Sequence, residues 1–294
     1  MRPLMRTLKT LLAAVGAAVV VLLVLSVMLS YLAGSSITGG PKVAVVKIEG
    51  VITDPAEITK QLKDLAKNDD VKAVVVRINS PGGAVGPSQE IHGEILRLRE
   101  KKAVVASMGT IAASGGYYAA VAADKIVANP GTITGSIGVI IEFVNAEELL
   151  SKIGIKGYVV KSGRFKDVGS PLRKMEKEET ELLQAVIDDV NGQFIDAVAK
   201  GRNMDPKRVA KIADGRIFTG AQALAQGLID SLGGLTEAIN IGAEMAGIEG
   251  EPEVVYIERR HLSLWNAVMG DGASNFTDLI SGMRLMYLTT NPES

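Results

Sequence analysis

The chain has 294 residues, 32 of them Lys or Arg and 33 Asp or Glu, which gives a formal net charge of −1, and it has no cysteine. This near-neutral balance gives no electrostatic basis for binding nucleic acid, and the lack of cysteine excludes disulfides, thiol catalysis and cysteine-ligated metal sites. Hydrophobic residues make up 47% of the sequence, and many are gathered at the N-terminus. The length suits one large domain, or two small ones, with a tail.

An uncharged apolar run over residues 11–32 is the first clear pattern, and three basic residues precede it: Arg2, Arg6 and Lys9. As a helix this run is about 33 Å long, enough to cross a hydrocarbon core of about 30 Å. Basic residues before the run and none after it until Lys42 predict a single-pass anchor in the cell (inner) membrane, with a cytoplasmic N-terminus and the body outside the cytoplasm. The alternative is a cleaved signal peptide, whose apolar region is typically shorter.

Strand-like and helix-like patterns alternate in the body of the chain. The expected strands are residues 43–48, 73–78, 103–108, 126–128, 157–161 and 216–218. The expected helices are residues 58–67, 88–101 and 176–200, one that begins at Ser114, and further helices within 204–247. Regular alternation of this kind indicates an α/β fold with largely parallel sheets.

Ser114 and Lys166 are the residues that suggest a chemistry for this fold. A serine hydroxyl is a poor nucleophile until a nearby base takes its proton. The chain has only two histidines, His92 in a helical pattern and His261 far toward the C-terminus. A lysine with a pKa lowered by burial can serve instead, and Ser-Lys variants of the serine protease site occur on several folds. The pair therefore predicts a serine hydrolase that works without histidine.

Two glycine pairs follow predicted strands, Gly82-Gly83 and Gly115-Gly116. Acyl transfer needs backbone N–H groups aimed at the oxygen that becomes negative, and glycine leaves room for the substrate. The N–H of Gly115, just after the serine, is one expected oxyanion donor, and that of Gly83 or its neighbour Gly82 is the second. Each feature alone is weak evidence, because glycine turns end many strands and a serine at a helix start is more often an N-cap.

The combination of motifs resembles the signal peptide peptidase A (SppA) family of bacterial and archaeal serine proteases, in its short, single-repeat form. The resemblance covers residues 43–256. It is carried, in the family's order and spacing, by residues 77–83 (RINSPGG), 113–118 (ASGGYY), 134–139 (TGSIGV), 162–171 (SGRFKDVGSP) and 214–220 (DGRIFTG).

This resemblance implies the Clp protease/crotonase-like superfold, with Ser114 as nucleophile, Lys166 as general base and Ser136 as the serine that hydrogen-bonds the lysine. It also implies a homo-oligomeric ring that completes and encloses the active sites, and no cofactor or metal. Asp167 is a complication, because a carboxylate close to the amine raises the lysine pKa and weakens the base. We therefore expect the Asp167 side chain to point away, toward Arg164 or a backbone turn.

The predicted function is a membrane-anchored serine endopeptidase that degrades signal peptides left in the membrane after secretion. One alternative is a quality-control protease for specific membrane or envelope proteins. Alternatives of other classes are a crotonase-fold acyl-CoA enzyme, which needs carboxylate acid/base residues, and an idle binding scaffold. Retention of both Ser114 and Lys166 counts against the scaffold.

Four segments are expected along the chain. They are a cytoplasmic N-terminus and anchor at 1–34, a linker at 35–41, the Ser-Lys protease domain at 42–260 and a C-terminal tail at 261–294. The tail has apolar residues at helical spacing between Phe276 and Met286. A membrane surface, a neighbouring subunit and the protein's own groove are its candidate partners, with a subunit contact favoured.

Overall fold

A computed structural model describes residues 16–26, 28, 40–257 and 286–288. The chain falls into two units, Met1–Gly40 and Pro41–Ser294. In the first unit, residues 16–26 and 28 are helical. Among the residues described, no helix is both long and apolar enough to cross a bilayer. Ten of the 22 residues of the predicted anchor at 11–32 lie outside the described residues, so the anchor stays a prediction.

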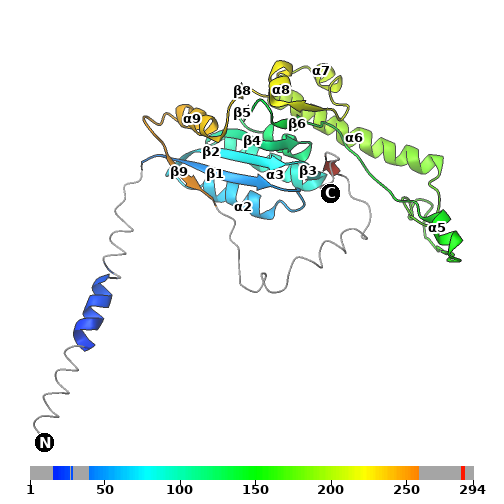
Figure 1. Ribbon diagram of the computed structural model, residues 1–294, viewed down its shortest axis with the longest axis horizontal. Helices are drawn as coiled ribbons and strands as arrows, with labels where there is room; N and C mark the ends of the chain where they lie inside the picture. Colours follow the sequence, from blue (N-terminus) through cyan, green and yellow to red (C-terminus); the bar gives the residue numbers. More distant parts are fainter. Residues whose placement is uncertain (1–15, 27, 29–39, 258–285, 289–294) are drawn as a thin grey trace, which may run out of the picture. The chain divides into compact units, whose positions relative to one another are not determined.

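The second unit is built on an eight-stranded sheet with the order β7-β6-β4-β2-β1-β9, in which β5 also pairs with β4 and β8 pairs with β5 (Figure 1). All its pairs are parallel except β6–β7. The strands of this sheet are β1 (Lys42–Glu49), β2 (Val71–Ser80), β4 (Ala103–Ala113), β5 (Lys125–Ala128), β6 (Ile133–Gly135), β7 (Ile217–Thr219), β8 (Ser231–Leu232) and β9 (Glu253–Tyr256). A separate antiparallel pair joins β3 (Gly82–Ala84) to β10 (Met286–Leu288).

The helices are α2 (Ala56–Leu65), α3 (Val85–Arg99), α4 (Gly115–Ala120), α5 (Glu147–Lys152), α6 (Lys177–Arg202), α7 (Pro206–Ala210), α8 (Gly220–Gln226) and α9 (Leu235–Met245). Alternate residues of β1 and β2, such as Val45 and Val75, pack with α9 on one face of the sheet. The residues between them, such as Val46 and Val76, pack in the larger core with α2, α3 and α4. Because both faces are covered, the centres of these strands are apolar at consecutive positions, as in other parallel sheets.

The α/β class and most of the predicted strands and helices are confirmed, but the strand predicted at 157–161 is wrong. These residues form no strand, and their side chains are exposed. A strand needs a neighbour to accept and donate its backbone hydrogen bonds, and the described part of the chain places none beside this segment. The apolar pattern that suggested a strand therefore belongs to an exposed arm, residues 140–176.

The helix α6 connects the arm to the core. A capping box formed by Glu176 and Glu179 starts it, and Asn203 in the left-handed conformation ends it. Its inner face carries Phe194, which is fully buried and lies 4.9 Å from the ring of Tyr118 in α4. The Tyr118 ring in turn lies 4.8 Å from His92 in α3. This aromatic cluster holds α4 in place between two longer helices.

Replacing Phe194 with alanine should lower the free energy of unfolding by about 3–5 kcal/mol, because it removes a fully buried ring and leaves a cavity. Urea unfolding followed by circular dichroism measures the effect. The matched control is Leu182→Ala on the same helix, where the side chain is 40% exposed. A loss for Phe194→Ala no larger than that of the control would contradict the packing role.

Candidate active site

The predicted nucleophile lies where two neighbouring parallel strands end. In the β4–β6 pair, Ala113 is opposite Gly135, so Ser114 and Ser136 each follow a paired residue. The Ser114 N–H donates a hydrogen bond of 2.8 Å to the Gly135 carbonyl. The carboxyl edge of a parallel sheet is the usual place for a site in an open α/β fold.

Ser114 itself has two unusual properties. Its backbone has φ 52° and ψ −118°, outside the regions that a residue with a side chain prefers. Its side chain is fully buried, and its hydroxyl has no hydrogen-bond partner within the described part of the chain. A conformation of this kind costs about 1–3 kcal/mol and gathers at functional sites. A buried hydroxyl without a partner is likewise rare unless it has a chemical role.

Gly83 and Gly115, the two predicted oxyanion donors, come from different elements and meet beside Ser114. A Cβ atom at Gly115 would lie 3.2 Å from the Gly83 nitrogen and 2.5 Å from the Ser88 hydroxyl oxygen. A Cβ atom at Gly83 would lie within 2.6 Å of three backbone atoms of Ile52. Only glycine fits at either position, so close approach of the backbone explains both residues.

The orientation of Gly83 follows from its neighbours in β3. The Gly82 carbonyl accepts from the Ile52 N–H at 2.9 Å, and the Ala84 N–H donates to the Ile52 carbonyl at 2.7 Å. Backbone groups alternate in direction along a strand, so the N–H and carbonyl of Gly83 face the opposite edge. The predicted donor thus points away from Ile52, toward the side of β3 on which β10 lies.

Ser136 borders a cavity next to this edge. It is 6% exposed, has φ 50°, and donates its N–H to the Arg216 carbonyl at 2.8 Å. Only three non-glycine residues of the described chain have positive φ, and Ser114 and Ser136 are two of them. The cavity has a volume of about 670 Å³, and its apolar lining includes Ile111, Ile133, Val139, Ile187 and Ile217. The Asn191 side-chain oxygen, also at its wall, is buried without a hydrogen-bond partner in the described structure.

Lys166 is not brought to this cluster within one chain. It lies in a turn of the arm, where its N–H donates to the Gly163 carbonyl at 3.1 Å, and its side chain is exposed. Within the described residues, no hydrogen bond or ion pair joins it to Ser114 or Ser136. Figure 1 shows the segment around α5 at the outer end of α6, away from the sheet. The structure thus brings Ser114, Ser136, Gly83 and Gly115 together and leaves Lys166 apart.

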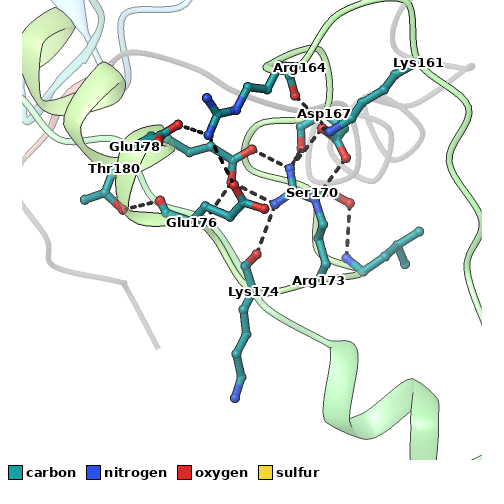
Figure 2. Close-up of polar contacts among 11 residues, drawn as sticks. Lys161, Arg164, Asp167, Ser170, Arg173, Lys174, Glu176, Glu178 and Thr180 are labelled. Atoms are coloured by element: carbon teal, nitrogen blue, oxygen red, sulfur yellow. Dashed lines mark hydrogen bonds and ion pairs between the residues drawn. The ribbon is translucent and has the colours of Figure 1, made fainter.

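Asp167 binds other residues than its neighbour Lys166, as expected, but Arg164, the partner predicted for it, is not among them. Instead of Arg164, its carboxylate binds Arg173 at 2.9 and 3.0 Å and also Lys161 (Figure 2). Arg164 pairs with Glu178. The hydrogen bonds from Arg173, and then from Lys161, hold the pKa of Asp167 well below its usual range. Within the described residues, no ion pair joins the Lys166 amine to Asp167 or to any other carboxylate.

Arg173 also binds Glu179, which is 3% exposed and belongs to the capping box of α6. The Arg173 guanidinium, helped by the Glu176 N–H, lowers the pKa of Glu179 to about 2. One arginine therefore ties the turn that carries Lys166 to the first turn of α6. These contacts hold the backbone of the arm around Lys166, although the Lys166 side chain takes part in none of them.

His92 does not take the role of the base. Its ring packs on Tyr118, and burial lowers its pKa to about 4, so the ring is neutral at pH 7. The Ser114 hydroxyl has no partner in the described residues, and so none in His92. His261 lies outside the described residues. No group of three His, Asp or Glu side chains in the described chain is arranged to hold a metal ion.

Two further serines shape the site, and the sequence pattern assigned neither of them a role. The Ser80 hydroxyl accepts from the Gly82 N–H at 3.1 Å and so supports the glycine turn. The Ser88 hydroxyl donates to the Ala84 carbonyl at 2.9 Å and fills the space beside Gly115. The position of Ser80 within the motif at 77–83 could have indicated its role. Ser88 lies in a helical pattern that gives no such indication.

The Arg173 network should respond to pH in a defined direction. The pKa values of Asp167 and Glu179 are lower in the folded arm than in the unfolded chain, where these groups ionise at about pH 4. The stabilisation that they give is therefore present above about pH 4. It is lost as the pH falls toward their pKa values in the folded arm. Hydrogen exchange over residues 161–179 should therefore be faster in Arg173→Met than in the wild type at pH 7, with a smaller difference at pH 3. Arg164→Met is the control, because Arg164 is 60% exposed. A difference in exchange rate between Arg173→Met and the wild type that is as large at pH 3 as at pH 7 would refute this account.

Comparisons with known proteins agree with this geometry. The family model for peptidase family S49 matches residues 97–249, and that for Clp protease matches residues 43–132. A Synechocystis sp. protein named as a protease is 47% identical over 210 residues, which is 71% of this chain and 76% of that protein. An Enterococcus faecium protein whose name describes a signal peptide peptidase SppA is 38% identical over 213 residues, 68% of this chain and 62% of that protein. Protease 4 of Salmonella typhi is 38% identical over 222 residues, 72% of this chain and 36% of that protein.

The match thus spans less than two thirds of the length of the second and third of these relatives. The Clp protease match covers the strands that place Gly83 and Ser114, and the S49 match covers Ser114, Ser136 and Lys166. The fold is accordingly a Clp protease-like α/β fold with a mixed sheet. On this evidence the chain belongs to peptidase family S49, a family of serine proteases.

Proposed function

We propose that this protein is a serine endopeptidase in which Ser114 is the nucleophile and Lys166 the general base. The observation that carries the proposal is the state of Ser114. Its side chain is fully buried, its backbone is strained, and its hydroxyl has no hydrogen-bond partner in the described residues. The N–H groups of Gly83 and Gly115 lie beside it and are the donors for the oxyanion. Membership of a serine protease family supports the assignment.

The reaction follows from these positions. Ser114 attacks the scissile carbonyl while neutral Lys166 takes its proton, and the two glycine N–H groups stabilise the negative oxygen. Lys166 then protonates the leaving amine, and it later activates the water that hydrolyses the acyl-enzyme. Ser136 accepts a hydrogen bond from the amine and holds it in line with Ser114. Lysine can act in this way only when burial lowers its pKa, because exposed lysine is charged at pH 7.

A neighbouring copy of the chain supplies Lys166 in this proposal. Within one chain the lysine is exposed and makes no hydrogen bond with Ser114, whereas Ser136 borders a cavity lined by both apolar and polar side chains. The arm presents exposed apolar side chains such as Tyr158 and Val160, together with Phe165 beside the lysine. Insertion of one copy's arm at the next copy's site would bury these groups and desolvate the amine. Repetition of this head-to-tail contact produces a ring when the rotation between successive copies closes, and a ring is what we propose.

The substrates we propose are signal peptides left in the membrane after secretion. The supporting observations are the apolar N-terminal run, its preceding basic residues and the name of the Enterococcus faecium relative. In this proposal residues 11–32 anchor the protein in the cell membrane and the protease domain lies outside the cytoplasm. A protease held at the membrane meets its substrates where they are released.

Ser114→Ala and Lys166→Ala should each lower peptide hydrolysis by about 10³-fold or more, and the double variant should lose little further, because the two groups act as a unit. Steady-state hydrolysis of an apolar signal-peptide mimic gives these rates. Lys166→Arg should be as inactive as Lys166→Ala, because guanidinium is not deprotonated in proteins. A Lys166→Ala protein with wild-type turnover would remove the lysine from the mechanism.

Mixing the two inactive variants tests whether the dyad forms between copies. If Ser114 and Lys166 come from adjacent copies, co-assembled Ser114→Ala and Lys166→Ala chains should regain about a quarter of wild-type activity, since random head-to-tail contacts restore one complete pair in four. The double variant mixed with wild type is the control for subunit exchange. A dyad formed within one chain predicts no activity in the mixture.

Gly83→Ala should lower kcat by about 100-fold or more, because an oxyanion donor is displaced when the added Cβ atom overlaps the Ile52 backbone. The matched control is Gly86→Ala in the first turn of α3, where a Cβ atom has no neighbour within 4 Å. Thermal unfolding of both variants separates misplacement of the donor from loss of the fold. Equal kcat values for a folded Gly83→Ala protein and the control would contradict the assignment of Gly83.

A further inference from the structure

The strand β4 contains a bulge shortly before Ser114. Ile78 of β2 is opposite Met108 of β4, but Ser80, only two residues further along β2, is opposite Ala112, which is four residues further along β4. Residues 109–111 therefore lie where an even ladder would have one residue, and we call them the β4 bulge. Bulges bend a strand, and they are frequent next to active sites, where they redirect the chain.

At the bulge β4 changes the neighbour on one of its edges. Before it, residues 105–108 pair with β5, and from its last residue onward, residues 111–113 pair with β6. A strand that changes its partner in this way turns a corner of the sheet. The strand β6 is the one whose Gly135 carbonyl accepts the hydrogen bond from the Ser114 N–H. The bulge therefore brings the end of β4 to the junction on which the candidate site is built.

The bulge also sets how far β4 extends beyond β2. With an even ladder, β4 would reach the level of Ser80 two residues earlier, and Ser114 would lie about 7 Å further along the strand direction. In the structure Gly115, the residue after Ser114, lies so close to Gly83 that an added Cβ atom would be 3.2 Å from the Gly83 nitrogen. A shift of about two residues is larger than this contact tolerates. The meeting of the nucleophile and the two glycines thus depends on the bulge.

One side chain, that of Asn79, accepts hydrogen bonds from the bulge. Its oxygen accepts from the Thr110 N–H at 3.1 Å and from the Ile111 N–H at 3.3 Å. Backbone groups that a bulge removes from the ladder need such a partner. Gly109 leaves room for it, because a Cβ atom there would lie 3.0 Å from the Asn79 oxygen. The Thr132 hydroxyl donates to the Gly109 carbonyl at 2.7 Å, so side chains from two other segments hold the bulge.

We propose that Asn79 is a positioning residue for the nucleophile. By accepting from both N–H groups of the bulge it fixes the bend in β4, and the bend places Ser114 beside the N–H group of Gly83. Asn79 acts in this way through the backbone of β4 and not through the reacting groups themselves. This inference rests on the proposed function, since the serine that is positioned is the nucleophile of the proposed peptidase.

Three variants of the full-length chain test this role. Asn79→Ala removes the acceptor, and Asn79→Asp keeps a side-chain oxygen at the same distance from the backbone. Lys72→Ala is the matched control, because Lys72 is exposed and lies on the same strand, away from the bulge. Asn79 is exposed as well, so its replacement leaves the core intact. Thermal unfolding checks that all three variants are folded.

Hydrogen exchange over residues 109–114 should be about fivefold or more faster in Asn79→Ala than in Lys72→Ala, because the bulge opens more often without its acceptor. Asn79→Asp should exchange like the control. Equal exchange in Asn79→Ala and Lys72→Ala would overturn the proposal. This measurement does not depend on catalysis, so it stands apart from the proposed function.

Hydrolysis of an apolar peptide should show kcat lowered about tenfold or more in Asn79→Ala relative to Lys72→Ala, with KM within about threefold, because a misplaced nucleophile affects the transition state more than peptide binding. Asn79→Asp should restore kcat to within about threefold of the control. Equal kcat values for Asn79→Ala and the control would overturn the positioning role, as would an Asn79→Asp protein as slow as Asn79→Ala. A wild-type protein that hydrolyses no peptide would overturn the peptidase assignment instead, and the exchange rates would then decide the role of Asn79 alone.

Discussion

The hydrogen bond from the Ser114 N–H to the Gly135 carbonyl fixes the end of β4 against the end of β6, and the other groups of the site are positioned from that junction. Ser136 follows directly from β6, and Gly115 follows directly from Ser114. Gly83 reaches the same point because neither glycine has a Cβ atom to keep the two backbones apart. Close backbone approach, more than any side-chain contact, is therefore what creates the site.

The junction holds Ser114 in an unfavourable backbone conformation, and the surrounding packing offsets that cost. The helix α4 begins directly after Ser114 and is buried along its whole length. Tyr118 on this helix lies between His92 and Phe194, which belong to α3 and α6. The strain at the serine is thus maintained by the packing of α4 in the core, and the Ser114 hydroxyl stays without a hydrogen-bond partner in the described structure.

The groups of the proposed mechanism lie on two parts of the chain, the body and the arm. The body has the proposed nucleophile and oxyanion donors, while the arm carries Lys166 on a turn held by Arg173, Asp167 and Glu179. In our proposal, copies of the chain must assemble before a peptide is cut, which limits proteolysis to assembled protein.

The sequence by itself determined the α/β class, most strands and helices, and the residues of the candidate site, because buried parallel strands leave uninterrupted apolar runs and the glycine and serine motifs follow them directly. It did not determine where Lys166 lies, since a local motif does not say whether two residues meet within one chain. The same limit explains the wrong strand at 157–161 and the partners of Asp167, which depend on what lies beside the arm. Only the tertiary structure decided that β10 pairs with β3, because more than 200 residues separate the two strands and their pairing depends on an edge that folding leaves open.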